Sequence, residues 1–103
     1  MDATTPDDLK SRLDEGQRIF LKLWKPGCGV CKLSEPATDR LEKANPHNLT
    51  FLKISVEDYP EMLEVSGTEV LPAFFVFADK EKKGLNIGFK GLKKLQDFVD
   101  GCF

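Results

Sequence analysis

The chain has 103 residues, of which 41% are hydrophobic and 31% charged, and its formal net charge is −2. These values predict one globular domain, residues 1–103, large enough to fold without a disulfide framework or a structural metal. They argue against a nucleic-acid binder, which needs a basic surface, and against a membrane protein, because no apolar run approaches the ~20 residues that span a bilayer.

The N-terminal segment, residues 1–8, is acidic and polar. A secretory signal would be basic and then apolar, so we expect a cytoplasmic protein. Within this segment, Thr5 suits the N-cap and Pro6 the first position of a helix that Gly16 ends. Residues 19–24 follow as an apolar strand of the kind that is covered on both faces.

Lys22 is the single charged residue of that strand. After a turn, the residues Cys28 and Cys31 open a helix that we expect to run to residue 44, with a kink at Pro36.

The rest of the chain alternates strands and helices. We expect a strand at 51–56, a short helix between Pro60 and Gly67, a buried strand at 74–77, a charged turn at 79–84, an edge strand at 85–89 and a terminal helix with an apolar stripe from Leu92 to Cys102. The order α-β-α-β-α-β-β-α implies a right-handed parallel crossover and a closing antiparallel pair. The sequence therefore predicts an α/β fold, with a four-stranded mixed sheet flanked by four helices.

Three cysteines are present, two in the pair Cys28-Gly29-Val30-Cys31 and one, Cys102, near the end. Three is the wrong number for a stapled secreted scaffold. In a reducing compartment, a close pair points to redox chemistry or to a metal.

The segment around the pair, Trp24-Lys25-Pro26-Gly27-Cys28-Gly29-Val30-Cys31-Lys32, resembles the active-site segment of thioredoxins. Pro36 matches the proline that kinks the active-site helix of the family. Leu71-Pro72 stands where the family has its cis-proline, and Gly88 matches a glycine that borders the substrate groove. The resemblance implies a thioredoxin-like fold that lacks the family's first strand, and thiol–disulfide oxidoreductase activity.

The chain departs from the family pattern at three positions. Lys22 stands where thioredoxins carry an acid beneath the second cysteine, which puts the proton-transfer step in question. Gly27 replaces the usual tryptophan and changes the shape of the substrate surface. Val30 replaces the proline inside the pair and bears on the redox potential.

The resemblance implies a two-step exchange carried by the cysteine pair. The Cys28 thiolate, favoured at a helix N-terminus, attacks a substrate disulfide, and Cys31 resolves the mixed disulfide to leave a Cys28–Cys31 disulfide. The pair is then the only redox centre, without a cofactor. The alternative is a pair of packed thiols, or a disulfide that does not turn over.

Two of the departures leave alternatives open. The N–H of Val30 can donate to the Cys28 sulfur and make the protein a weaker reductant than thioredoxin, or its side chain can simply cover the disulfide. Lys22 can be a buried partner that accepts the proton of Cys31, or its ammonium can reach the edge of the sheet while its stem packs. For Lys22 we favour the second interpretation.

Leu71 and Pro72 are expected to be joined by a cis bond that turns the Leu71 backbone toward a groove, where an extended substrate adds as a strand. The alternative is an ordinary loop proline. A low-relief apolar patch would surround this point, formed by Gly27, Gly29, Val30, Val56, Val70, Leu71, Gly88 and Phe89.

Other residues have simpler interpretations. Trp24 is expected to pack under the active-site turn, Cys102 to be a small core residue with a regulatory disulfide as its alternative, and His47 to be a solvated loop residue. A zinc site built from Cys28, Cys31, Cys102 and His47 has suitable ligand types but only one recognisable ligand pair.

The sequence thus predicts a monomeric protein-disulfide oxidoreductase. Its expected partners are protein disulfides and a thioredoxin reductase or other dithiol donor, with no metal. Three rival functions are a peptide-docking module that has lost catalysis, a metal or iron–sulfur carrier, and a glutathione-dependent reductase similar to glutaredoxins.

Overall fold

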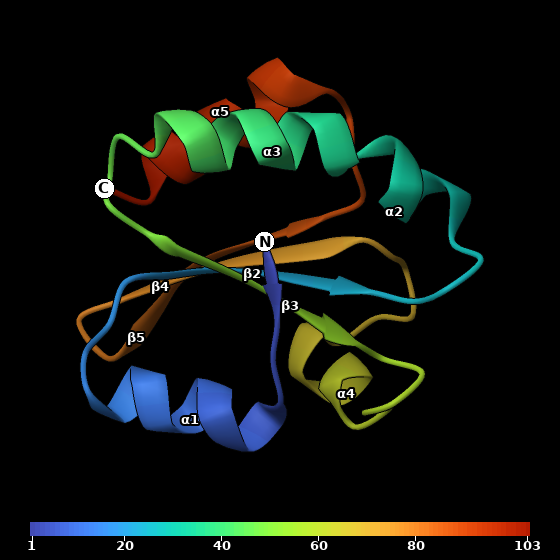
Figure 1. Cartoon of the computed structure of the whole chain (residues 1–103), viewed down its shortest axis with the longest axis horizontal. Coiled ribbons are helices and arrows are strands. Elements are labelled where there is room, and N and C mark those ends of the chain that lie inside the picture. The colour runs from blue at the N-terminus through green and yellow to red at the C-terminus, as the bar shows by residue number, and fades with distance from the viewer.

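The computed structural model describes residues 1–103 and contains one mixed sheet with the strand order β1-β3-β2-β4-β5 (Figure 1). The strands are β1 (Asp2–Ala3), β2 (Ile19–Trp24), β3 (Thr50–Ser55), β4 (Ala73–Ala78) and β5 (Glu81–Ile87). Strand β3 runs parallel to β1 and β2, whereas β4 is antiparallel to both of its neighbours, β2 and β5. The predicted crossover and closing antiparallel pair are both present.

Helices cover both faces of the sheet. They are α1 (Pro6–Asp14), α2 (Gly29–Leu33), α3 (Glu35–Ala44), α4 (Met62–Ser66) and α5 (Leu92–Gly101). Figure 1 shows α3 and α5 on one face and α1 with α4 on the other, which gives three layers. None of these helices has the length and apolar character needed to cross a membrane.

The alternation of side chains along β2 divides the core into two clusters. Ile19, Leu21 and Leu23 belong to the cluster that includes Leu9 of α1 and Met62 of α4. The intervening residue Phe20 belongs to the cluster on the α3 and α5 face, where its ring centroid lies 4.8 Å from that of Phe51. Because Lys22 is two residues beyond Phe20, it also points to the α3 face.

The sheet has five strands, so the predicted count of four is wrong. The missed strand, β1, pairs Asp2 with Leu52 and Ala3 with Lys53 at the edge of the sheet. A segment of two residues is too short to show the alternation of polar and apolar side chains that marks a strand. Asp2 and Ala3 form a strand only because they pair with β3.

Two other element boundaries differ from the prediction. The single helix expected from Cys28 to residue 44 is divided at Ser34 into α2 and α3, so the sheet has five helices around it instead of four. The expected charged turn at 79–84 is confined to Asp79 and Lys80, both with positive φ, and β5 begins at Glu81. Edge strands tolerate charged side chains because one side of the strand remains in solvent.

Candidate functional site

The strand directions bring three loops together at one end of the strands. Leu23, near the end of β2, pairs with Ala73, the first residue of β4. The backbone N–H of Gly88, just beyond β5, donates to the carbonyl of Pro72 at 2.7 Å. The turn that follows β2, the Leu71-Pro72 segment and Gly88 therefore lie side by side, as the sequence predicts. The Leu71-Pro72 peptide bond is cis.

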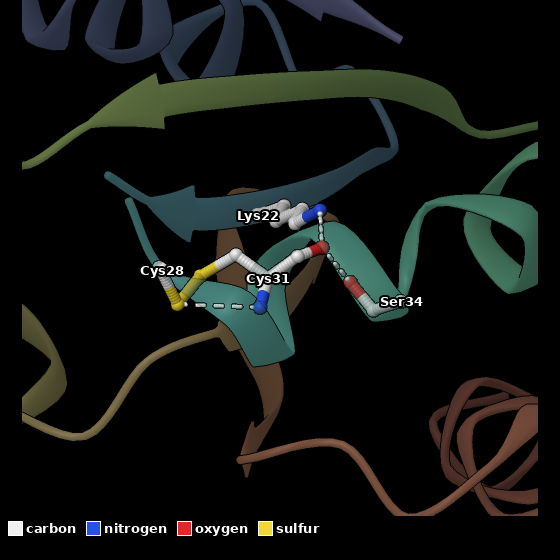
Figure 2. Close-up of a disulfide and its surroundings, with 4 residues drawn as sticks. All are labelled: Lys22, Cys28, Cys31 and Ser34. Atoms are coloured by element: carbon white, nitrogen blue, oxygen red, sulfur yellow. Dashed lines mark hydrogen bonds between the residues drawn. A yellow bond between two sulfur atoms is a disulfide. The ribbon is translucent and has the colours of Figure 1, made fainter. Parts of the chain in front are cut away.

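Cys28 and Cys31 form a disulfide at the start of α2, with their Cα atoms 5.2 Å apart (Figure 2). Cys28 is the N-cap residue, and its sulfur accepts a hydrogen bond from the Cys31 N–H at 3.2 Å. Cys28 is half-buried, whereas only 2% of Cys31 is exposed. An external disulfide can therefore reach the sulfur of Cys28 far more easily than that of Cys31.

The hydrogen bond to the Cys28 sulfur differs from the one that the sequence suggested. Of the two alternatives for Val30, donation to the Cys28 sulfur is not the one found, because the donor is the N–H of Cys31. An N-cap side chain reaches back to the second or third N–H of its helix, and Cys31 is the third residue of α2. Val30 instead exposes 44% of its surface beside the pair.

The helix that carries Cys31 breaks at Ser34, directly after α2 ends. Pro36 has no N–H, so the regular hydrogen-bond ladder cannot continue through this point. The carbonyl of Cys31 has no backbone N–H partner. It accepts one bond from Lys22 Nζ at 2.9 Å and one from Ser34 Oγ at 2.7 Å, as Figure 2 shows. Sequence reasoning missed Ser34, although a serine three residues after a helical carbonyl is a recognisable signal.

Lys22 is buried, with 4% of its surface exposed. The preferred expectation that its ammonium reaches solvent at the sheet edge is wrong, because Lys22 lies in a central strand with the α2–α3 break above it. Burial lowers the pKa of Lys22, and the charge of Lys53 lowers it further. The carboxylates of Glu35 and Asp39 on α3 act in the opposite direction.

A recess of about 310 Å³ opens beside the cysteine pair. Gly27 has φ of +79°, and a Cβ added at Gly27 or at Gly29 would meet no atom within 4 Å. The charged residues that line the recess are Lys25, Lys32 and Glu35. The absence of side chains at the two glycines leaves the disulfide accessible from this side.

The predicted apolar patch is present only in part. Val70 is exposed, Leu71 is half-buried, and neither the N–H nor the carbonyl of Leu71 has a partner within the chain. By contrast, Val56 is buried in the α1 and α4 cluster, and Phe89 packs against the other cluster. These last two residues support the surface from beneath because their side chains complete the core.

Trp24 lies beside the turn and is half-buried. The Nζ of Lys53 lies 5.1 Å from the centroid of its ring, and its Nε1 is buried without a partner. Trp24 also lines the recess beside the cysteines, together with Glu35.

The remaining predicted residues lie elsewhere. His47 is no simple loop residue, since its Nε2 is 2.8 Å from Asp100 Oδ1 and its ring stacks on Phe103. Cys102 is half-buried, and its thiol donates to the Phe98 carbonyl at 3.3 Å. Figure 1 shows α2 and the C-terminus at opposite ends of the molecule. The structure therefore does not assemble the zinc ligand set proposed from His47 and the three cysteines.

Known proteins share this architecture. The thioredoxin family model matches residues 1–101. Thioredoxin of Bacillus subtilis is 28% identical over 96 residues, which cover 93% of this chain and 91% of that protein. A chloroplastic M-type thioredoxin of Zea mays is 28% identical over 82 residues, 80% of this chain and 49% of that protein. Oxidized mitochondrial thioredoxin 3 of Saccharomyces cerevisiae superposes with a TM-score of 0.83 at 20% identity, covering 97% of this chain and 94% of that one. With its two cysteines at bonding distance in the place where this fold carries its reactive pair, the chain belongs to the thioredoxin family and is a thiol–disulfide oxidoreductase.

Proposed function

We propose that this protein reduces the disulfides of protein substrates, with Cys28 as the nucleophile and Cys31 as the resolving thiol. The observation that carries this assignment is the asymmetry of the pair. Cys28 is half-buried at the N-cap and accepts a backbone N–H, whereas Cys31 is enclosed. A donor aimed at the Cys28 sulfur favours its thiolate, which is the attacking species in thiol–disulfide exchange.

The reaction proceeds through one mixed disulfide. The Cys28 thiolate attacks one sulfur of the substrate disulfide, the substrate S–S bond breaks, and the first substrate thiolate leaves. Cys31 then loses its proton to solvent and attacks the Cys28 sulfur, which releases the second substrate thiolate. Two electrons pass to the substrate, and the Cys28–Cys31 disulfide forms.

Substrates bind as an added strand beside Leu71. Its unpaired N–H and carbonyl offer the main-chain contacts that an extended peptide needs. Gly27, Gly29 and Gly88 face open space, because a Cβ at any of them would meet no atom within 4 Å, so a peptide has room to approach the backbone there. Val30 and Val70 add exposed apolar surface.

A reductase or another dithiol returns the pair to the reduced state, since the cysteine pair itself holds the electrons and needs no prosthetic group. We place the protein in the cytoplasm as a monomer. The free thiol of Cys102 supports a reducing compartment, and the net charge of −2 provides no basic surface for nucleic acid.

An insulin-reduction assay driven by dithiothreitol tests the proposal. The chain should accelerate insulin precipitation, and Cys28→Ser should lower the rate to that of dithiothreitol alone. If the unaltered chain is no faster than Cys28→Ser, the site is a docking surface without catalysis. Metal analysis of freshly purified protein tests a second rival, a metal or iron–sulfur carrier.

A further inference from the structure

The resolving cysteine is held by an unusual set of hydrogen bonds. Its carbonyl lies at the α2–α3 break, where no backbone N–H reaches it, and two side chains supply the donors. One of them, Ser34, comes from the break itself. The other, Lys22, comes from the central strand β2 and crosses from the sheet to the helix. Lys22 therefore ties the position of Cys31 to a central strand in which five of the six residues are buried.

The charge of Lys22 is not neutralised by a direct ion pair. The charged groups around it are Glu35 and Asp39 on α3 and Lys53 on β3. Neither carboxylate forms a salt bridge with its Nζ within 4.0 Å. Met1 lines the same cavity, and its N-terminal ammonium pairs with Glu42 at 2.7 Å. Because Lys22 is buried and lacks an ion-pair partner, its charge is less screened than that of a surface lysine and acts more strongly on its neighbours.

The orientation of Lys22 lets it hold the backbone of Cys31 but does not place it to accept the proton of the Cys31 thiol. In Figure 2, its Nζ lies on the carbonyl side of Cys31, and the disulfide lies on the other side. The ammonium thus contacts the backbone of the resolving cysteine and does not meet its sulfur.

We propose that Lys22 is a positioning residue for the resolving step, which holds Cys31 through its carbonyl and favours the Cys31 thiolate through its positive charge. This inference rests on the proposed function and names the control of its second step. A cation here acts with the opposite sign to an acid at this position, since it stabilises the thiolate instead of opposing it. At pH values where Cys31 is ionised in the dithiol, it therefore favours the dithiol over the disulfide and makes the protein a weaker reductant.

The step that Lys22 assists is the attack of Cys31 on the Cys28 sulfur of the mixed disulfide. The Cys28–Cys31 bond forms, the bond between Cys28 and the substrate breaks, and the substrate thiolate leaves. The Cys31 proton passes to solvent. Lys22 keeps its own protons throughout, so it is not a catalytic base.

The charge is tested in the Cys28→Ser background, where Cys31 is the thiol of interest and no turnover is required. Alkylation of Cys31 is followed against pH by mass spectrometry, with and without Lys22→Met. We expect the midpoint to move to higher pH and the rate near neutral pH to fall about tenfold, because a cation that favours the thiolate is lost. In the chain with both cysteines, the equilibrium with glutathione should move toward the disulfide, and the shift should grow as the pH rises and Cys31 ionises in the dithiol.

Three further variants separate the causes. Lys22→Gln keeps a donor for the carbonyl and removes the charge, Ser34→Ala removes the other donor and keeps the charge, and Lys53→Met removes a neighbouring cation that makes no bond to Cys31. We expect Lys22→Gln to shift the Cys31 profile as Lys22→Met does, and the other two to shift it by less than half as much. Circular dichroism checks folding, and Lys22→Gln alone carries the test if Lys22→Met does not fold.

An unchanged Cys31 profile and an unchanged glutathione equilibrium in the folded Lys22 variants would overturn the inference. An equal shift in Lys53→Met would also overturn it, because the effect would then belong to the general charge of the region. Failure of the unaltered chain in the insulin assay would remove the proposed function, but the Cys31 profile would still report on Lys22.

Discussion

The two ends of the molecule differ in how completely their polar groups are hydrogen-bonded within the chain. At the α2 end, the backbone of Leu71 has no partner, Trp24 Nε1 is buried and unpaired, and the disulfide borders an open recess. At the other end, the polar groups join the chain to itself. The Arg18 guanidinium donates to the His47 carbonyl at 3.0 Å, and His47 pairs with Asp100.

Phe103 also belongs to this second end of the molecule, which we call the closed end; the α2 end is the open end. Its ring stacks on His47 with centroids 4.5 Å apart, and the guanidinium carbon of Arg18 lies 5.1 Å from the centroid of the same ring. These contacts join the β2 entry, the α3–β3 loop and the C-terminus.

This difference in hydrogen bonding has a consequence for stability. Unpaired donors and acceptors are costly in a folded protein unless a ligand completes them. The contacts of the closed end contribute to stability, whereas in the proposed function the free backbone groups of Leu71 at the open end pair with a substrate strand. Changes at the open end should therefore alter disulfide exchange with little effect on unfolding, and changes at the closed end should do the reverse.

The largest expected effect is that of Cys31→Ser. Without a resolving thiol, the mixed disulfide persists, so turnover of insulin should fall at least 100-fold, on the order of a lost catalytic group. Mass spectrometry should detect a covalent adduct between Cys28 and the substrate, which dithiothreitol releases. Turnover at an unaltered rate would show that a second thiol does not have to come from Cys31.

The thiols at the two ends should differ in reactivity by about tenfold or more. Burial raises the pKa of the Cys102 thiol, so a smaller fraction of it is thiolate near neutral pH than for an ordinary cysteine. With the pair reduced, iodoacetamide should modify Cys28 before Cys102, and the Cys102 rate should keep rising above pH 9.

The direction of this pKa shift also determines how the effect of Cys102 on the free energy of unfolding depends on pH. Because the folded-state pKa of this thiol is raised, its contribution is present below the pKa of the unfolded chain and is lost as the pH rises through the folded value. Equal rates for Cys28 and Cys102 at pH 7 would contradict the contrast between the two ends.

Phe103→Ala should weaken the closed end. Loss of the stacking on His47 and of the cation–π contact with Arg18 is expected to lower the free energy of unfolding by about 1 kcal/mol. Urea unfolding measures this change, and the insulin assay should give the rate of the unaltered chain. A large loss of exchange activity would mean that the two ends are coupled.

The smallest expected effect concerns charge at the open end. Lys25 and Lys32 line the recess beside Cys28 against the single carboxylate of Glu35, so an anionic disulfide should be preferred over a cationic one. The ratio of rates for glutathione disulfide and cystamine should fall about threefold in Lys25→Gln/Lys32→Gln and with added salt. Lys94→Gln, on the exposed surface of α5, is the matched control and should keep the ratio.

The sequence by itself determined the elements that a local pattern of residues marks. The apolar runs of β2 and β4 marked central strands, and the spacing of Cys28 and Cys31 at a helix start marked the reactive pair. The order of elements was enough for the crossover topology, because parallel strands need a connection that crosses the sheet. These features depend on neighbours in the chain, so a single sequence contains them.

Tertiary structure alone decided the features that depend on which groups meet in space. The strand β1 exists only through its pairing with β3, and the role of His47 only through Asp100 and Phe103, 53 and 56 residues away along the chain. The N-cap geometry determined which backbone N–H donates to the Cys28 sulfur. The Cys31 carbonyl, which the helix break leaves without a backbone partner, determined where Lys22 Nζ donates its hydrogen bond. A buried donor or acceptor takes the partner that the surrounding packing offers, and the order of residues does not specify that partner.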